Sequence, residues 1–458
     1  MKHYDAIVIG TGQSGPPLAA RLTAEGHETA VIERKLFGGT CVNNGCIPTK
    51  TLIASARAAH VARRADDLGI AIEGTIRADM KRVKARKDGI VRESREGVES
   101  WMRGLERCTV YHDHARFVAP HAVEVGGERI EGDRIFINVG GRASVPDMPG
   151  LDGIDYYTNS NAMDIDFVPE HLLVVGGSYV GLEFAQMYRR FGSAVTVFQR
   201  GDRLVPREDE DISDAIREIL ERDGITIRVN AECMSVEKRR GRIAVRLDCA
   251  NGDDAVEGSH LLLAVGRIPN TDDLGLDAAG IAMDDHGYIR VDDQLRTNVE
   301  GVWAIGDCNG RGAFTHTSYN DYEIVAANLF DDDPRRVSDR ITAYALFIDP
   351  PLGRCGMTAR EVRASKRKAL VATWPMESVG RAKERGETQG FMKILVDAES
   401  EKILGAALLG IEGDELIHDI LDVMYAGATY HTIARAMHIH PTVAELLPTM
   451  LGDLEPLE

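Results

Sequence analysis

With 458 residues, of which 44% are hydrophobic and 28% charged, the chain has the composition of a soluble globular protein with two or three domains. Asp and Glu number 72 against 54 Lys and Arg, and the net charge of −18 disfavours nucleic acid and anionic membranes as partners, because both attract basic surfaces. No apolar run is long enough to cross a bilayer, and the N-terminal segment lacks a signal-peptide cleavage pattern, so we expect a cytoplasmic protein. The seven cysteines are too few and too scattered for a disulfide framework.

Residues 4–34 predict a strand, a glycine turn, a helix and a second strand, the βαβ unit of a dinucleotide-binding fold. The turn fits GxGxxG: Gly10 makes the tight turn, Gly12 admits a pyrophosphate to the backbone, and Gly15 lets the helix pack closely on the strand. Glu33 ends the second strand, where a carboxylate accepts a hydrogen bond from a ribose hydroxyl. This combination favours a nucleotide site over an ordinary turn in an α/β sheet.

Two segments of different character follow. Residues 75–105 predict one long polar helix, and we interpret the basic run at residues 80–87 as its solvated face rather than as a binding patch. Residues 110–150 predict short strands. Together they separate the first βαβ unit from a second one.

Residues 170–200 repeat the order of strand, glycine turn, helix and strand, which predicts a second nucleotide-binding domain. Gly176 and Gly181 keep the first and third glycine positions of the turn, whereas Ser178 replaces the middle glycine. A side chain at this position makes the close approach of a pyrophosphate a little less favourable.

The second strand of this unit ends in Gln199 and Arg200, with no acid at the ribose position, and Arg203 and Arg207 follow. An acid would repel a 2′-phosphate, whereas arginines would hold one. We therefore expect NADPH rather than NADH. The alternative is that these arginines are surface charge only.

The remainder of the chain divides into strand-rich stretches and a distinct C-terminal block. Residues 225–270 predict strands, and residues 297–310 predict an apolar strand that ends in Gly-Asp. Within the C-terminal block we expect strands at 392–397 and 403–410 and helices at 415–429 and 440–454.

The segment GGTCVNNGCIPTK, residues 38–50, holds Cys41 and Cys46 and poses a choice between a metal site, a structural disulfide and a redox pair. A four-sulfur zinc site needs a second close pair of cysteines, which the sequence does not offer. In a straight helix the two side chains would lie about 140° apart round the axis, so a disulfide requires a break, which Asn-Asn-Gly at residues 43–45 tolerates. A bridge in strained local geometry is easily reduced, which favours thiol–disulfide exchange.

This segment, the two nucleotide units, Gly306-Asp307 in GVWAIGDC and HIHPTVAE near the C-terminus resemble the class I pyridine nucleotide–disulfide oxidoreductases. The resemblance covers nearly the whole chain, and the cysteine segment is its most specific motif. It implies an α/β fold with two Rossmann-like domains, for FAD and NAD(P), plus a C-terminal α+β dimerisation domain. The implied boundaries are 1–148 and 271–340 for the two parts of the FAD domain, 149–270 for the NAD(P) domain and 341–458 for the dimerisation domain.

Carried over residue by residue, the resemblance implies a division of labour. Cys46 would be the charge-transfer thiol nearer the flavin, and Cys41 the interchange thiol that attacks the substrate. Lys50 would lie beside the flavin and pair with Glu183. Tyr179 resembles the tyrosine that gates the nicotinamide pocket.

His440 and Glu445 match the acid/base pair of the family, which the other subunit of a homodimer contributes to a composite active site. A thiolate nucleophile needs a group that takes and returns its proton near neutral pH; histidine does this, and a carboxylate fixes its tautomer. Taken alone, a His five residues before a Glu is more often structural, but the C-terminal position and the HPT context favour the catalytic interpretation. We interpret His438 as structural.

The resemblance also implies two sets of cofactor contacts and no metal ligand. The residues expected to contact FAD are Gly10, Gly12, Ser14, Gly15, Glu33, Gly39, Thr40, Lys50, Ala115, Gly140 and Asp307. The residues expected to contact NADPH are Gly176, Ser178, Tyr179, Gly181, Arg200, Arg207 and Gly266.

Within the family, the cysteine segment and FTHTSYNDYEIV at residues 314–325 resemble a branch described as mercuric-reductase-like. True mercuric reductases carry a C-terminal cysteine pair and often an N-terminal metal-binding domain, both of which are missing here, and they lack the His-Glu pair that this chain keeps. Soft Hg(II) needs thiolates to be passed inward, and only Cys41 and Cys46 are evident.

We therefore predict an FAD-dependent NAD(P)H oxidoreductase that passes electrons through a Cys41–Cys46 disulfide to a small-molecule disulfide or a thiol-reactive oxidant such as hypothiocyanous acid. The alternatives are reduction of Hg(II) or Cu(II), and a dihydrolipoyl dehydrogenase, which would favour an acid at Gln199. A redox-sensing or subunit-binding flavoprotein without turnover is disfavoured by the cysteine pair, Lys50 and His440. The sequence assigns no role to Cys108, Cys233, Cys249, Cys308 or Cys355.

Overall fold

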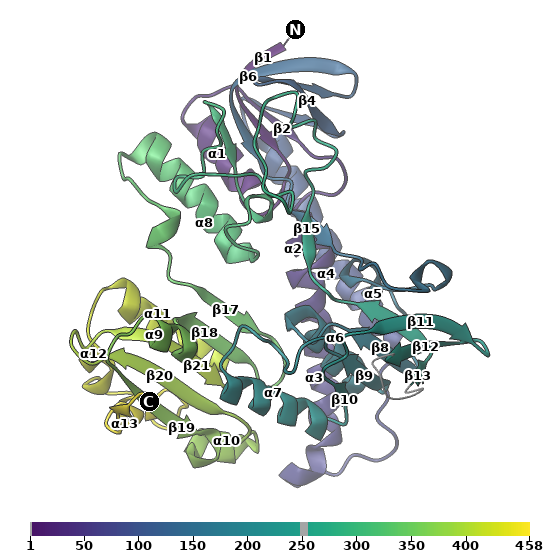
Figure 1. The fold of residues 1–458 in the computed structure, drawn as a ribbon, viewed down its shortest axis with the longest axis vertical. Helices are drawn as coiled ribbons and strands as arrows, with labels where there is room; N and C mark the ends of the chain where they lie inside the picture. Colours follow the sequence, from purple (N-terminus) through teal and green to yellow (C-terminus); the bar gives the residue numbers. More distant parts are fainter. Residues whose placement is uncertain (1, 248–254) are drawn as a thin grey trace.

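The computed structural model describes residues 2–247 and 255–458, and its chain folds into three parts (Figure 1). The upper part in Figure 1 holds the N-terminal sheet together with helix α8 (Thr315–Ala326), the lower right part holds the second sheet, and the lower left part holds the C-terminal residues. Cys249 and a part of the strand-rich stretch expected at residues 225–270 lie outside the described residues.

The first sheet has seven strands and contains the first βαβ unit. Parallel pairing gives the order β3-β2-β1-β6, and the far edge of β6 pairs with parallel β16 and with antiparallel β5, which continues to β4. The strands are β1 (Lys2–Ile9), β2 (Thr29–Ile32), β3 (Cys108–Tyr111), β4 (Ala115–Ala119), β5 (Ala122–Val125), β6 (Glu128–Ile137) and β16 (Val302–Ala304). Helix α1 (Gly15–Ala24) joins β1 to β2, as the sequence predicts.

The second part is a four-stranded parallel sheet in the order β10-β9-β8-β14, with a three-stranded antiparallel sheet, β11-β12-β13, beside it. Its strands are β8 (His171–Val175), β9 (Ala194–Phe198), β10 (Thr226–Arg228), β11 (Met234–Arg239), β12 (Arg242–Leu247), β13 (Ala255–Gly258) and β14 (His260–Leu263). Its helices are α5 (Asn159–Ala162), α6 (Tyr179–Phe191) and α7 (Glu210–Arg222). A two-stranded ribbon, β7 (Gly141–Ala143) with β15 (Arg267–Pro269), lies where the chain passes between the first and second parts.

The third part is a six-stranded antiparallel sheet in the order β17-β18-β21-β20-β19-β22. The strands are β17 (Ala343–Leu346), β18 (Leu352–Gly356), β19 (Ala369–Pro375), β20 (Phe391–Asp397), β21 (Ile403–Leu409) and β22 (Glu455–Pro456), and the helices are α9 (Ala359–Ala364), α10 (Gly380–Arg385), α11 (Gly413–Tyr425), α12 (His431–Ala434) and α13 (Leu446–Met450). Every residue of β21 is buried, because α11 packs beside it and residues such as Ala407 and Leu409 belong to the same apolar core as Leu182 and Phe184 of α6.

Three further helices connect the parts: α2 (Gly39–Asn44), α3 (Cys46–Arg63) and the long α4 (Met80–Gly104). Helix α3 packs on α4 and on α6, so it runs from the first part along the second (Figure 1). Two dinucleotide-type units and an α+β C-terminal part confirm the predicted fold class. Within the described ranges, no helix combines the length and apolar character needed to span a membrane.

Two sequence expectations were wrong in detail. Lys87, assigned to the solvated basic face of α4, is only 4% exposed, and its Nζ lies 3.1 Å from Asp164 and 2.5 Å from Asp88 because it joins α4 to the second part. The helix expected at residues 440–454 is confined to α13. Residues before it form turns in which the Thr442 hydroxyl bonds the Ile439 carbonyl, a side-chain contact that competes with helical bonding.

Candidate redox-active site

The two cysteines lie on either side of a helix break. Cys41 belongs to α2 and Cys46 is the first residue of α3, while Gly45 between them has φ −137° and ψ −117°. A Cβ at Gly45 would lie 2.8 Å from the carbonyl oxygen of Thr40, so a larger residue does not fit this backbone. The interruption that the cysteine spacing requires is therefore confirmed. It brings the two sulfurs into hydrogen-bonding contact, and both are free thiols in the structure.

The two thiols differ in proton affinity. The hydrogen bond from Cys41 lowers the pKa of Cys46 to about 6, and a hydrogen bond from the Thr315 hydroxyl and the charge of Lys50 act in the same direction against burial and Glu183. The hydrogen bond to Cys46 and burial raise the pKa of Cys41 well above that of a free cysteine. Near neutral pH the pair holds a thiolate on Cys46 and a proton on Cys41.

An ion pair lies one turn further along α3. Lys50 Nζ is 2.6 Å from Glu183 Oε2 of α6, and Glu183 is 6% exposed. The other oxygen of Glu183 accepts a hydrogen bond from the backbone N–H of Phe347 at 3.1 Å, and Lys50 Nζ lies 4.3 Å from the Phe347 ring centroid. The structure thus brings Lys50 and Glu183 together, and it fixes the ammonium group close to the thiols.

The first glycine turn has the geometry that a dinucleotide requires. Gly10 has φ +104°, and a Cβ there would lie 2.3 Å from the Asn138 carbonyl oxygen; a Cβ at Gly15 would lie 2.2 Å from the Gly10 oxygen. Glu33 Oε2 accepts hydrogen bonds from the Thr11 N–H (3.0 Å) and hydroxyl (2.6 Å). Each carboxylate oxygen has more than one lone pair, so Glu33 can hold the turn and still accept a ribose hydroxyl.

Other predicted FAD contacts surround this turn. Gly12 and Gly39 lie against each other, since a Cβ on Gly39 would be 2.8 Å from the Gly12 Cα. The side chain of Ser14 is buried and its Oγ lies 2.6 Å from the hydroxyl of Ser318 on α8, so only the backbone N–H of Ser14 remains for a phosphate. With bare glycines at the start of α1, the turn fits the pyrophosphate of FAD.

The remaining predicted FAD residues are spread over neighbouring elements. Asp307 follows β16 and lies 3.4 Å from Arg267; burial raises the pKa of its carboxyl. Gly140, just after β6, has φ +61° with open space around it, whereas Ala115 is buried in β4 and Thr40 lies in the first turn of α2.

The second glycine turn repeats these contacts with a different side chain. Gly176 has φ +120°, and a Cβ at Gly181 would lie 1.9 Å from its carbonyl oxygen. The N–H of Gly177 donates to Gln199 Oε1 at 2.9 Å. Ser178 precedes α6 at the place of the middle glycine, and Gly266 follows β14 with φ +126° and open space around it.

The arginines after β9 fall into two groups. Arg203 lies 3.4 Å from the Asp202 carboxylate, which reduces its availability for a phosphate. Arg200 and Arg207 are exposed, and within residues 2–247 and 255–458 neither has a carboxylate at ion-pair distance.

Tyr179 is the first residue of α6, directly after this turn. Its hydroxyl donates to Glu208 Oε1 at 3.2 Å, and its ring meets the rings of Phe314 and Tyr344 edge-on. Sequence reasoning assigned no role to Glu208 or Tyr344.

His440 and Glu445 pair with each other away from the cysteines of their own chain. His440 Nδ1 lies 2.8 Å from Glu445 Oε2, and the His440 side chain is 81% exposed. The flanking helices α12 and α13 lie on the outer side of the lower left part in Figure 1, far from α2. Ile439 beside it is 79% exposed, and Met437 is 98% exposed. The chain alone does not bring this pair to its thiols.

Sequence reasoning missed Thr315. Its hydroxyl lies 3.1 Å from Cys46 Sγ, although the two residues are 269 positions apart. The only local signal is a hydroxyl residue in the segment FTHTSYNDYEIV, which does not by itself indicate a thiol partner.

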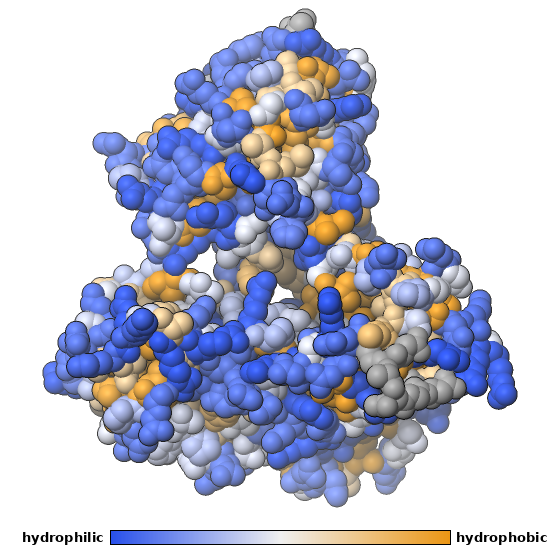
Figure 2. All heavy atoms as spheres, in the orientation of Figure 1, coloured by the Kyte–Doolittle hydropathy of each residue, from blue (hydrophilic) through white to orange (hydrophobic). Residues whose placement is uncertain are grey.

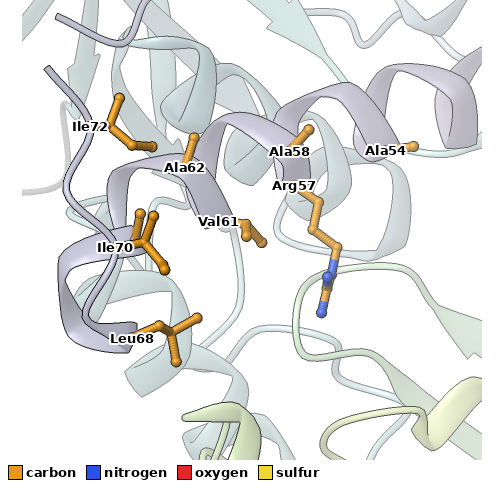
Figure 3. Close-up of a pocket in the computed structure, with 9 residues that line it drawn as sticks. Ala54, Arg57, Ala58, Val61, Ala62, Leu68, Ile70 and Ile72 are labelled. Carbon is orange, nitrogen blue, oxygen red and sulfur yellow. The ribbon is translucent and has the colours of Figure 1, made fainter. Parts of the chain in front are cut away.

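A separate open hollow of about 620 Å³ lies along α3 and the residues after it, lined by Val61, Leu68, Ile70 and Ile72 (Figure 3). Its only charged lining residue is Arg57, which pairs with Glu387 at 2.9 Å, so the hollow offers no reactive group. Figure 2 shows a second depression where the three parts meet. Across the described residues, no three or more His, Cys, Asp or Glu side chains are grouped to hold a metal ion.

Known proteins share the sequence and the fold of this chain. The family model for pyridine nucleotide-disulphide oxidoreductases matches residues 4–321, and the model for their dimerisation domain matches residues 342–451. The chain therefore belongs to the class I pyridine nucleotide–disulfide oxidoreductase family. It is a flavoprotein enzyme, an FAD-dependent disulfide oxidoreductase that uses a pyridine nucleotide.

Individual relatives align over almost the full chain. A probable pyridine nucleotide-disulfide oxidoreductase, RclA of Escherichia coli K12, is 35% identical over 98% of this chain and 98% of its own length. A dihydrolipoyl dehydrogenase of Thermus scotoductus is 32% identical over 97% of this chain and 96% of its own. The solved Cu(II) complex of the HOCl-induced flavoprotein disulfide reductase RclA from Escherichia coli has a TM-score of 0.90 and 33% identity, and covers 99% of both chains.

Proposed function

We propose that this enzyme transfers electrons from NADPH, through FAD and the Cys41–Cys46 pair, to a small-molecule disulfide or a thiol-reactive oxidant. The observation that carries the proposal is the contact of two thiols at the helix break, with a pKa of about 6 on Cys46 and a raised pKa on Cys41. One sulfur is thus a thiolate beside the cationic Lys50, and the other keeps a proton that a base has to remove.

When bound, FAD would supply a ring that accepts hydride from the nucleotide and delivers two electrons to the thiol pair. Glu33, the glycine turn at Gly10 and Asp307 would hold it. Lys50, oriented by Glu183 and Phe347, would place a positive charge beside its ring.

The thiol chemistry balances in two steps. Cys41 gives up its proton and attacks one sulfur of the substrate disulfide, and the second substrate sulfur leaves as a thiol that takes up a proton. The Cys46 thiolate then attacks Cys41 in the mixed disulfide, which releases the first substrate sulfur and closes the Cys41–Cys46 bridge. Each cycle uses two electrons from the reduced pair and the one proton of Cys41, which ends on the second substrate sulfur; the first substrate sulfur leaves as a thiolate, which takes its proton from solvent.

The proton on Cys41 requires a base, and we assign it to His440 of a second subunit. The His440 side chain is 81% exposed and its Nδ1 is fixed by Glu445, which leaves Nε2 for proton transfer. The match to the dimerisation domain and the exposed Met437 and Ile439 support a homodimer in which this loop reaches the partner's thiols.

Reduction of a metal ion is the second candidate, because the RclA structure is described as a Cu(II) complex. A metal ion accepts electrons from the thiols without proton transfer to a leaving sulfur, so His440 would matter little. The two candidates therefore differ in their dependence on His440.

The test is oxidation of NADPH and of NADH by the FAD-loaded enzyme with glutathione disulfide, lipoamide, hypothiocyanous acid, Hg(II) and Cu(II), with oxygen alone as the baseline. We expect His440→Ala to lower turnover of the disulfide or oxidant substrate about 100-fold or more, because general acid–base catalysis is lost. His438→Ala, two residues earlier in the same loop, should leave it unchanged. Turnover with a metal ion alone, indifferent to His440→Ala, would instead establish a metal reductase.

The pKa of Cys46 gives an independent prediction. Its pKa is lowered from the usual value near 9 to about 6, so the thiolate is present above this pH and is lost as the pH falls through it. In a Cys41→Ser background, where no disulfide can form and a serine hydroxyl replaces the Cys41 thiol as donor, the thiolate–flavin charge-transfer absorbance should disappear as the pH falls. Thr315 and Lys50 should still keep its midpoint below the pKa of a free cysteine. Thr315→Val should raise the midpoint by about one pH unit, because a hydrogen bond to the thiolate is lost.

The matched controls for this titration are Thr315→Ser and Thr51→Val. Thr315→Ser keeps the hydroxyl and should restore the original midpoint. The hydroxyl of Thr51, on the helix that carries Cys46, donates to the Ile47 carbonyl at 2.8 Å, so its loss should not affect the thiolate. An unchanged midpoint in Thr315→Val would show that Thr315 does not stabilise the Cys46 thiolate.

A further inference from the structure

Glu208 and Arg354 are the most deeply buried charged side chains that the structure describes, at 0% and 1% exposure, and the thiol chemistry uses neither. Glu208 lies between β9 and α7 in the second part, and Arg354 lies on β18 of the C-terminal part. Arg354 Nε is 3.7 Å from Glu208 Oε2. Burying two charges costs free energy unless they are well paired, so we expect this pair to serve a function.

The other oxygen of Glu208 accepts two tyrosine hydroxyls. Tyr344 of β17 donates to Glu208 Oε1 at 2.6 Å, and Tyr179 donates to the same oxygen at 3.2 Å. Burial and the charge of Glu208 raise the pKa of both tyrosines, so both hydroxyls keep their protons and act as donors. Glu208 therefore connects Tyr179 to two strands of the C-terminal sheet.

Glu208 cannot follow Tyr179 if the tyrosine moves, because its neighbour Asp209 is fastened to the C-terminal part. Asp209 accepts hydrogen bonds from the backbone N–H groups of Ala359 (2.9 Å) and Arg360 (3.1 Å) at the start of α9. It also lies 3.0 Å from the buried Lys393 Nζ of β20. The segment around Glu208 is thus fixed to the third part of the molecule.

Tyr179 adjoins the second glycine turn and is linked to the thiol pair through Phe314 and Thr315. It follows the turn directly, and its ring meets Tyr344 and Phe314 edge-on at centroid distances of 5.4 and 6.3 Å. Phe314 precedes Thr315, whose hydroxyl touches Cys46. The Tyr179 side chain also packs against the apolar core that contains Leu182, but its hydroxyl is what ties it to Glu208. A displaced Tyr179 would leave Glu208 still paired with Tyr344 and Arg354.

We propose that Glu208, fixed by Arg354 and Tyr344, is the anchor that holds Tyr179 across the path of the pyridine nucleotide. The inference rests on the proposed use of NADPH and on the expectation, from the family resemblance, that the nucleotide has to displace Tyr179. Glu208 is a positioning residue: it sets the fraction of molecules in which the path is closed, and it thereby lowers the apparent affinity for the nucleotide.

The test is calorimetric titration of the oxidised FAD enzyme with NADP⁺, together with steady-state kinetics. Tyr179→Phe keeps the ring and removes the hydrogen bond to Glu208, so we expect the Kd for NADP⁺ and the KM for NADPH to fall about fivefold while the KM for the oxidant stays unchanged. Glu208→Gln should change both in the same direction by a smaller factor, since a neutral amide is the weaker acceptor.

Tyr188→Phe is the matched control. Tyr188 is also on α6 and is also buried, and its hydroxyl donates to the Ala162 carbonyl at 2.6 Å. Its loss should lower stability and leave the Kd for NADP⁺ unchanged. The anchor role of Glu208 would be contradicted if Tyr179→Phe bound NADP⁺ no more tightly than the wild type. It would also be contradicted if Tyr188→Phe lowered the Kd for NADP⁺ by the same factor.

The binding titration needs no turnover, so it separates the anchor from the proposed function. The same variants are titrated with NAD⁺. If the wild-type enzyme binds NAD⁺ and not NADP⁺, the NADPH assignment fails, and the anchor is then judged on the NAD⁺ affinities by the same criteria.

Discussion

The two glycine turns of this chain hold their backbones with equivalent contacts. A Cβ at Gly15 would lie 2.2 Å from the Gly10 carbonyl oxygen, and a Cβ at Gly181 would lie 1.9 Å from that of Gly176. In both, the first glycine has a positive φ, +104° and +120°. The close packing of strand on helix leaves no room for a side chain at either position, which is why both turns keep these glycines.

The turns differ in the side chain that secures them from the next strand. The Thr11 N–H donates to the carboxylate of Glu33 at 3.0 Å, whereas the Gly177 N–H donates to the amide oxygen of Gln199 at 2.9 Å. A hydrogen-bond acceptor is enough to hold the turn, so the side chain that supplies it can be either charged or neutral. We interpret the charge as the variable that selects the nucleotide at each turn.

The substitution Gln199→Glu makes the second turn carry the charge of the first. The carboxylate can still accept from Gly177, so the turn should persist, but it would repel a 2′-phosphate. We expect kcat/KM for NADPH to fall about 30-fold and that for NADH to rise, in line with a change of about 2 kcal/mol in binding. Steady-state kinetics with both nucleotides measures the ratio.

The bound flavin of this variant should be unchanged, since the first turn is untouched, and this is checked by the ratio of flavin to protein absorbance. An unaltered preference between NADPH and NADH would mean that Gln199 does not face the ribose, and the comparison of the two turns would then say nothing about specificity.

A smaller effect is expected from the arginines that follow Gln199. Arg200→Ala and Arg207→Ala should each raise the KM for NADPH about threefold, and less at high salt, because each removes one exposed charge near the 2′-phosphate. The KM for NADH should not change. Measurements at low and high ionic strength provide the test.

Arg203 supplies the control, since the neighbouring Asp202 already lies 3.4 Å from its guanidinium. Arg203→Ala should leave the KM for NADPH within about twofold, as is usual for exposed ion pairs. The opposite pattern, with the larger loss at Arg203, would show that the phosphate-binding residues are assigned incorrectly.

Sequence patterns predicted the elements whose determinants are local. Glycine turns between apolar strands and helices identified both βαβ units, and the spacing of Cys41 and Cys46 required the break that Gly45 makes. Each of these features depends on residues within about 30 positions of one another, so composition and periodicity are sufficient.

Contacts between distant segments could not be predicted in this way. Thr315 meets Cys46 across 269 residues, and Glu208 meets Tyr344 across 136. The prediction of a solvated face on α4 was wrong at Lys87 because the partner of Lys87, Asp164, belongs to another part of the fold. Residue type alone does not show which side chains the folded topology brings together.

The exposure of His440 also has a consequence for inheritance. If the thiols of one chain depend on the histidine of another, a chain lacking Cys41 and a chain lacking His440 can each be inactive alone and yet form one intact site in a mixed dimer. Conversely, in a cell with one normal and one defective gene copy, a mixed dimer would lose an active site although one of its two chains is normal. The unit on which selection acts is then the pair of gene products rather than the single polypeptide.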